Sequence, residues 1–311
     1  MLLKICYNTH IDLSKGFTKM YELVKITENC YYIESPAKIG IIKINDTDVA
    51  LIDSGNDKDA GKRVLKLLQA NGWSLKAIYN THSNSDHIGG NKYLQEQTGC
   101  EIFAPSIECD MTSHPILEPA FLYGGFPFSE LRHKFLLAKE SNAQYLTPER
   151  LPSGVEIIHL PGHFFDMVGF RTSEDIVFLA DCLSSRETLD KYAICFIYDV
   201  AGYLQTLDAV KSMKATLFVP SHASPTEDIS ELAQYNIDKM HEIADKIVSI
   251  CSSALTFEVI LQRLFEEYSL KMTFEQYVLV GSTVRSYLSW LKENGRLSAT
   301  FDNNLLLWKA I

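Results

Sequence analysis

The sequence lacks long apolar runs and has no excess of basic residues. No stretch approaches the roughly 20 apolar residues that a helix needs to cross a bilayer. The opening residues 1–7 are too short and too mixed for a signal peptide. Against 39 Asp and Glu there are only 29 Lys and Arg, a net charge of −10. We therefore expect a cytoplasmic protein that does not enter a membrane and does not take nucleic acid as an obligate partner.

The sequence also lacks the cysteine pattern of a disulfide-stabilised fold. Its seven cysteines are odd in number, and none forms a Cys-X-X-Cys pair. Disulfide frameworks are typical of small secreted chains, whereas 311 residues can bury a large core. We expect free, buried thiols in a reducing compartment at Cys6, Cys30, Cys100, Cys109, Cys182, Cys195 and Cys251.

Predicted strands alternate with predicted helices through residues 39–219, which indicates an α/β domain. The predicted strands are 39–44, 49–53, 75–81, 101–104, 155–160, 167–172, 175–180 and 216–219, and the predicted helices are 58–71, 91–98 and 200–213. Residues from about 105 to 150 interrupt this alternation of strands and helices. We expect an insertion there that serves either as a functional lid or as a packing or dimer surface.

A domain boundary is expected near Pro225, which separates residues 1–225 from a smaller domain at 226–311. Helical spacing at 228–249, 256–268 and 274–294 precedes a predicted terminal hairpin, a pattern typical of a winged helix. A winged helix that reads DNA would be basic, but residues 226–311 hold eight Lys or Arg and twelve Asp or Glu. We therefore expect this domain to support a homodimer or to cover the active site.

The densest group of potential metal ligands lies in the turn that follows the strand 75–81. The turn reads His82-Ser-Asn84-Ser-Asp86-His87 and is followed by Gly89 and Gly90 and by a predicted helix. Imidazole and carboxylate side chains at this spacing suit a borderline-soft divalent cation such as zinc. The glycines let the backbone pass close to such a site.

This turn resembles the His-X-His-X-Asp-His motif of the metallo-β-lactamase-fold superfamily, in particular its glyoxalase II-like and winged-helix-bearing branches. Four further residues at the ends of predicted strands match the family in order, namely Asp53, His163, Asp181 and His222. The resemblance covers residues of about 25–225. It implies an α/β fold, a four-layer αββα sandwich with the site at one edge, and a small C-terminal domain.

The resemblance also implies two metal sites bridged by Asp181. The first site would use His82, His163 and position 84, and the second would use Asp86, His87 and His222. Asn84 stands where the family has its second histidine, and a neutral amide oxygen is a poor zinc ligand. Asn84 is thus either a weak ligand or a residue that hydrogen-bonds within the turn. We expect one or two ions per chain, zinc first and manganese or iron as alternatives, with the second site binding more tightly.

Three further roles are expected. Asp86 would orient an attacking water in catalysis, besides binding metal. Asp53 would hold the turn or a ligand imidazole by a hydrogen bond. Tyr123, Phe126 and Phe128 either line an apolar substrate pocket or belong to the core.

The resemblance points first to a metal-dependent hydrolase of EC class 3. Hydroxide generated at the metal would attack an acyl bond of a small molecule, such as a thioester or a lactone. One alternative is a metal-dependent phosphodiesterase or ribonuclease, because two-metal sites also serve phosphoryl transfer. Another is a mononuclear iron oxygenase or a member that binds metal without catalysis.

Overall fold

The computed structural model describes residues 20–311, and by internal contacts the chain divides into two units. The first unit comprises the described residues up to 160 together with 165–181 and 214–228. The second comprises residues 161–164, 182–213 and 229–311. Cys6 and the first 19 residues of the expected domain 1–225 lie outside the described residues.

A seven-stranded sheet, in the order β1-β2-β3-β4-β5-β6-β7, forms the larger layer of the first unit. Four antiparallel strands come first, and three strands parallel to the last of them follow. The strands are β1 (Glu22–Lys25), β2 (Cys30–Glu34), β3 (Ile39–Lys43), β4 (Asp48–Ile52), β5 (Ser74–Tyr79), β6 (Glu101–Ala104) and β7 (Ala143–Tyr145). Helices α1 (Lys58–Ala70) and α3 (Asn91–Thr98) make the crossovers between the parallel strands β4, β5 and β6.

A four-stranded sheet in the order β11-β10-β9-β8 forms the second sheet layer of this unit. Strands β8 (Glu156–His159), β9 (Val168–Arg171) and β10 (Ile176–Ala180) are antiparallel neighbours. Strand β11 (Leu217–Pro220) pairs with β10 in parallel. The parallel pairs β4-β5 and β10-β11 matter most here, because the carboxyl ends of parallel strands lie at the same edge of a sheet.

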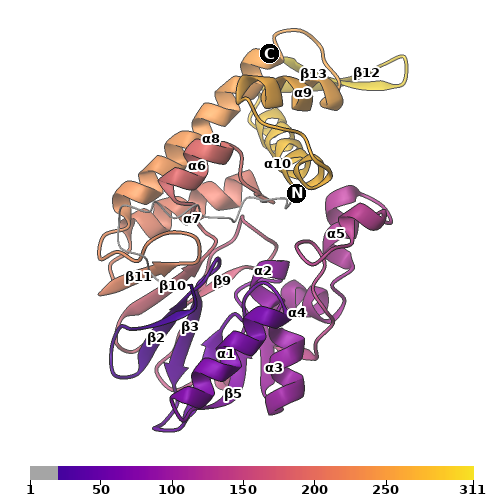
Figure 1. Ribbon diagram of the computed structural model, residues 1–311. Helices are drawn as coiled ribbons and strands as arrows, with labels where there is room; N and C mark the ends of the chain where they lie inside the picture. Colours follow the sequence, from indigo (N-terminus) through magenta and orange to yellow (C-terminus); the bar gives the residue numbers. More distant parts are fainter. Residues whose placement is uncertain (1–19) are drawn as a thin grey trace. The chain divides into compact units, whose positions relative to one another are not determined.

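Two buried apolar clusters hold these layers together. One joins the two sheets, with Tyr79 and Phe103 of the first sheet packed in the same cluster as Phe170 and Phe178 of the second. The other lies between the first sheet and its helices and contains Val64, Leu68 and Leu94. Helices α1 and α3 therefore cover the outer face of the seven-stranded sheet (Figure 1). The predicted α/β class is confirmed.

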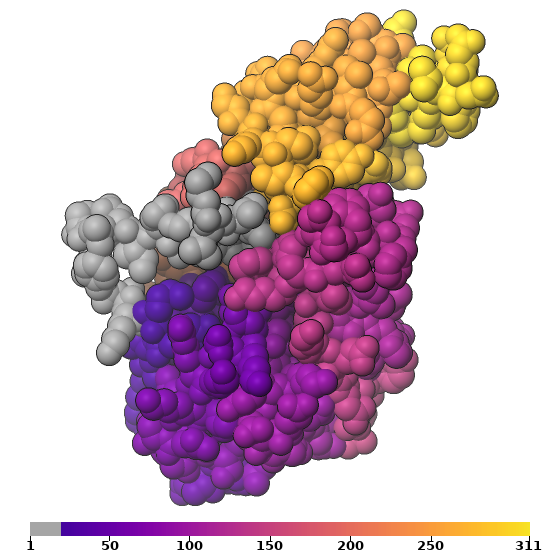
Figure 2. Space-filling model, turned by 45° about the vertical axis from the view of Figure 1, so that its right-hand side comes forward, coloured from indigo at the N-terminus to yellow at the C-terminus, as the bar shows by residue number. Residues whose placement is uncertain are grey.

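The insertion after β6 begins with two short helices. It contains α4 (Ser106–Ser113) and α5 (Leu117–Tyr123), followed by a 3₁₀ turn at Ser129–Leu131. It then supplies β7, the last strand of the large sheet, and a second 3₁₀ turn at Pro148–Arg150. The magenta surface of the first unit in Figure 2 is formed largely by this segment. A lid or dimer role for it stays a prediction.

The second unit is helical and ends in a hairpin. Its elements are α6 (Arg186–Tyr192), α7 (Val200–Ser212), α8 (Ser230–Ile250), α9 (Phe257–Glu267), α10 (Phe274–Glu293), β12 (Leu297–Asp302) and β13 (Leu305–Ala310). Residues 182–213 belong to it because α7 packs along α8 and because Thr283 Oγ1 of α10 accepts a hydrogen bond from Ile197 N. The unit is thus larger than residues 226–311. A boundary near Pro225 and the winged-helix assignment both stay predictions.

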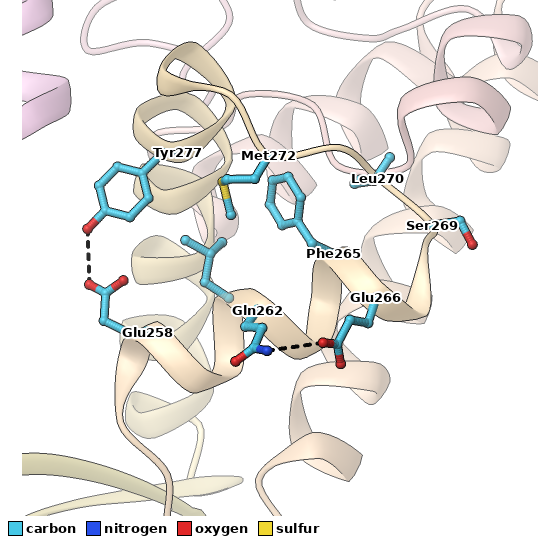
Figure 3. A pocket seen from close by; sticks show the side chains of 9 residues that line it. Glu258, Gln262, Phe265, Glu266, Ser269, Leu270, Met272 and Tyr277 are labelled. Atoms are coloured by element: carbon cyan, nitrogen blue, oxygen red, sulfur yellow. Dashed lines mark hydrogen bonds between the residues drawn. The ribbon is translucent and has the colours of Figure 1, made fainter.

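A cavity of about 560 Å³ lies within the second unit, between α9 and the start of α10 (Figure 3). Its apolar lining includes Leu261, Phe265 and Met272, and Glu258 and Glu266 lie at its rim. None of the residues that were singled out for chemistry in the sequence lines this cavity.

Among residues 20–311, no helix is both long enough and apolar enough to span a bilayer. The predicted free thiols are confirmed at five buried positions, Cys30, Cys100, Cys109, Cys182 and Cys251. The prediction that Cys195 is buried is wrong, because its thiol, which forms no disulfide, is only partly buried. Cys195 lies in the irregular segment between α6 and α7.

Candidate metal centre

Six of the predicted site residues come together at one edge of the first unit. Asp53 directly follows β4, and the turn that carries His82, Asp86 and His87 follows β5. Asp181 directly follows β10, and His222 lies two residues beyond β11. Each parallel pair of strands thus delivers its polar side chains to the same sheet edge, which is where open α/β sheets place their sites.

The ligand turn is seated against the loop after β4. Ser54 N donates to His87 O at 2.8 Å, and Gly90 N donates to Gly55 O at 3.2 Å. A Cβ atom at Gly90 would lie 2.3 Å from Ser54 O, so only glycine allows this approach. The single helical turn α2 (Ser85–Ile88), which presents Asp86 and His87, is therefore fixed by backbone contacts before any ligand binds.

Asp86, His87, Asp181 and His222 form a compact group of potential metal ligands. One ligand atom from each lies within 4.8 Å of the others. His87 Nε2 lies 3.1 Å from Asp181 Oδ1, and His222 Nε2 lies 3.0 Å from Asp181 Oδ2. His222 Nε2 is also 3.4 Å from Asp86 Oδ2. Two imidazoles and two carboxylates around one point are a donor set that suits zinc and similar divalent ions.

The tautomers of three histidines can be derived from their neighbours. His87 Nδ1 lies 2.8 Å from Asp53 Oδ2, and His222 Nδ1 lies 2.8 Å from Pro36 O, and both oxygens can only accept. Thr81 Oγ1 donates its one hydrogen to Asp53 Oδ2, so it accepts from His82 Nδ1 at 2.9 Å. Each imidazole thus carries its proton on Nδ1 and offers Nε2 as the lone pair, which is the arrangement of metal-binding histidines.

The charges of the group also fit a cation. Burial lowers the pKa of His87, but the Asp181, Asp86 and Asp53 carboxylates outweigh this and raise it well above its ordinary value. Burial likewise opposes the effect of Asp181 on His222, whose pKa is raised to about 9. Burial raises the pKa of Asp181, but the imidazoles of His222 and His87 outweigh burial and hold this pKa well below its usual range. The carboxylates around the two imidazoles thus favour positive charge at this point, which a bound divalent ion would supply.

Buried polar atoms support the same assignment. Within residues 20–311, His87 Nε2 and Asp86 Oδ2 are buried and have no hydrogen-bond partner of good geometry. Such atoms are costly unless something binds them. The residues present thus fit a divalent metal ion at the second site.

The expected first site is less complete within the first unit. His82 is buried, and its ring centroid lies 4.1 Å from that of His87. His82 and Asp181 offer ligand atoms within 4.8 Å of each other. His163 is buried in the segment 161–164, which belongs to the second unit, and its role as a ligand stays a prediction. Asn84 is the N-cap residue of α2 and donates from Nδ2 to Glu118 Oε1 at 2.8 Å.

Two buried glutamates behind the ligand turn were not found in the sequence. Glu108 of α4 accepts hydrogen bonds from Ser83 N at 3.0 Å, Ser83 Oγ at 2.7 Å and Asp166 N at 2.9 Å. Burial raises the pKa of Glu108 to about 7 and that of Glu118, on α5, well above its ordinary value. Nothing in the local sequence distinguishes them from surface glutamates, because their partners lie 25 and 34 positions away.

The three aromatic residues expected near a substrate lie at the surface of the insertion. Tyr123 is 43% exposed, Phe126 75% and Phe128 36%. The rings of Tyr123 and Phe128 pack edge to face with centroids 5.4 Å apart, and Arg132 lies over the Phe126 ring. A role for them in a substrate pocket stays a prediction.

The fold and the ligand group define a class: an α/β sandwich with a His- and Asp-rich metal centre at its sheet edge. The sequence model of the Metallo-beta-lactamase superfamily matches residues 27–222, which is more than half of the chain. The chain belongs to this superfamily. Solved structures agree on the fold: a Beta-lactamase domain protein from Burkholderia ambifaria superposes with a TM-score of 0.70 at 12% identity, over 96% of each chain. A metallo-beta-lactamase family protein from Thermus thermophilus gives 0.64 at 15%, over 93% of this chain and 97% of that one.

Similar curated proteins are named hydroxyacylglutathione hydrolases. The protein from Pelagibacter ubique is 32% identical over 130 residues, 42% of this chain and 45% of that protein. The one from Rhizobium johnstonii is 28% identical over 121 residues, 39% and 38% of the two chains. The chain thus spans less than half the length of these relatives.

Proposed function

We propose that the protein is a metal-dependent hydrolase that cleaves an acyl bond of a small molecule, with thioesters as the first substrate class. The observation that carries this proposal is the group of Asp86, His87, Asp181 and His222. The names of the similar hydroxyacylglutathione hydrolases support the thioester class.

The chain's own residues prepare the site for this chemistry. A bound divalent ion would lower the pKa of a water ligand to about 7 and polarise a carbonyl oxygen. Asp53 and the Pro36 carbonyl hold the His87 and His222 rings so that Nε2 of each faces Asp181. Asp86 Oδ2, 3.4 Å from His222 Nε2, is placed to bind the ion or to hold the attacking water by a hydrogen bond.

We further propose that zinc is the native ion at the second site, because the two imidazoles match its preference. A homodimer and a cytoplasmic location complete the proposal. The homodimer rests on the expected additional C-terminal domain, and the cytoplasmic location rests on the odd number of cysteines without a disulfide pattern.

The test compares His222→Ala with His241→Ala on the intact chain. His241 is an exposed residue of α8, so its replacement is a matched histidine control. Hydrolysis of hydroxyacyl thioesters, including hydroxyacylglutathione, is followed together with the metal content of each protein. We expect His222→Ala to lose at least about 100-fold in kcat/KM and to bind less metal while keeping its circular dichroism. His241→Ala should match the wild type. Full activity in His222→Ala, or no hydrolysis by metal-loaded wild type across acyl substrates, would contradict the proposal.

A further inference from the structure

Asn84 is the departure from the family motif, and a residue of the insertion holds its side chain. Asn84 Nδ2 lies 2.8 Å from Glu118 Oε1, and Ser85 Oγ lies 3.4 Å from Glu118 Oε2. Glu118 comes from α5 and is only 4% exposed. Burying a carboxyl group costs free energy unless hydrogen bonds compensate, and the Asn84 and Ser85 side chains provide them here.

These contacts fix which atom of the Asn84 amide faces away from Glu118. Ser85 Oγ donates to Glu118 Oε2. Glu118 Oε1 accepts a hydrogen bond from the amide nitrogen of Asn84. The amide oxygen Oδ1 then lies on the other side of the same planar group. Without Glu118 the amide could turn over, because its two ends have nearly the same shape.

The chemistry of an amide oxygen sets the class of cation. It is a neutral, hard donor, which suits Mn²⁺ or Mg²⁺ better than it suits zinc, whereas imidazole suits zinc. His82 and Asp181 offer ligand atoms within 4.8 Å of each other, and Asn84 lies two residues beyond His82 in the same turn.

We infer that Glu118 is a positioning residue of the first metal site: by holding Asn84 Nδ2, it presents Asn84 Oδ1 to a divalent cation beside His82 and Asp181. The inference rests on the proposed metal centre and adds that the first site accepts an oxygen-preferring ion, with Mn²⁺ as the probe. The insertion thereby contributes to metal choice through α5.

The experiment titrates the metal-stripped full chain with Mn²⁺ and, separately, with Zn²⁺. Native mass spectrometry counts the ions, and chelator competition gives their affinities. For the wild type we expect two ions of different affinity. Glu118→Met, which keeps the volume but removes the acceptor, should weaken the looser ion by about 10- to 100-fold and leave the tighter ion unchanged. Glu118→Gln keeps an oxygen acceptor and should remain within a few-fold of the wild type.

Two further variants separate positioning from a merely structural role. An imidazole at position 84 does not depend on the orientation of an amide, so Asn84→His combined with Glu118→Met should recover the second ion, now with a preference for zinc. Glu108→Met makes the same change at a buried glutamate that contacts Ser83 and makes no hydrogen bond to Asn84, and it should leave the looser ion within a few-fold.

Four results would overturn the inference: a wild type that binds a single ion, an unchanged looser ion in Glu118→Met, no recovery in the double variant, or an equal loss in Glu108→Met. No substrate enters these measurements. A chain that binds two ions as described but hydrolyses no acyl bond would therefore refute the proposed function alone.

Discussion

Asp53 can be tested by replacing one oxygen with an NH₂ group. Its carboxylate is 1% exposed and accepts three hydrogen bonds of 2.8 Å, from Thr81 N, from Thr81 Oγ1 and from His87 Nδ1. Asparagine has nearly the same shape and tolerates the left-handed backbone at this position, where φ is +62°. Asp53→Asn therefore changes the hydrogen bonding while keeping the backbone and the volume.

The expected magnitude follows from the two orientations of the new amide. If its NH₂ faces Thr81 N, two donors meet, which costs about 1–3 kcal/mol of folding stability. If its NH₂ faces His87, that ring must move its proton to Nε2, and Nε2 can then no longer bind a metal. We therefore expect a lower Tm for the metal-free chain in the first orientation, and a metal affinity at the second site weaker by about 10- to 100-fold in the second.

The assay is thermal unfolding of the metal-stripped chain together with chelator competition for Zn²⁺. Asp48→Asn, at a partly exposed aspartate of β4 outside the metal centre, serves as the control for a change of charge. An unchanged Tm together with an affinity within twofold of the wild type in Asp53→Asn would refute the view that this carboxylate sets the His87 tautomer.

Three further predictions concern pH, backbone and metal. Burial raises the folded-state pKa of Glu108 from 4.5 to about 7, so its proton contributes stability that is complete below a pH of about 4.5 and is lost as the pH rises through 7. Between these pH values the free energy of unfolding of the metal-free wild type should fall by up to about 3 kcal/mol relative to that of Glu108→Gln. If the unfolding free energies of the two proteins change in parallel with pH, the prediction is wrong. In Gly162→Ala, a Cβ atom would lie 2.1 Å from Tyr203 N at a φ of +120°, so we expect a loss of at least about 2 kcal/mol in denaturant unfolding. Gly72→Ala, which meets no atom within 4 Å, is the control, and an equal effect in both would contradict the steric reason. A bound ion at a free concentration of 1,000 Kd stabilises the folded chain by about 4 kcal/mol, so removing it with a chelator should lower the Tm of the wild type accordingly. The Tm of His222→Ala should change much less. Equal Tm shifts in the two proteins would place the stabilising ion elsewhere.

The sequence predicted those parts of the site that depend on local pattern. His82, Asp86 and His87 fall within one six-residue turn, and Asp53, Asp181 and His222 each follow a short apolar strand that is easy to recognise. Parallel pairing explains why Asp53 lies near the ligand turn and why Asp181 lies near His222, whereas the meeting of these two groups was predicted through the resemblance to the superfamily.

What could not be predicted depends on contacts between distant segments. Glu108 and Glu118 lie on the buried faces of their helices. A search for apolar periodicity does not identify acidic residues in such positions. Strand β1 was missed because it lies at the sheet edge and has no fully buried residue. Helix α6, with the sequence RETLDKY, was missed because it buries only Leu189 and so has no apolar stripe. In each case the packing partner decides the structure, and the local sequence does not contain it.

The central claim is that Asp86, His87, Asp181 and His222 bind a divalent ion. The most direct measurement is native mass spectrometry of the metal-stripped chain titrated with Zn²⁺, for the wild type and for His222→Ala. The account predicts at least one tightly bound ion in the wild type and the loss of that ion in His222→Ala. A tight ion that persists in His222→Ala, or a wild type that binds none, would contradict it.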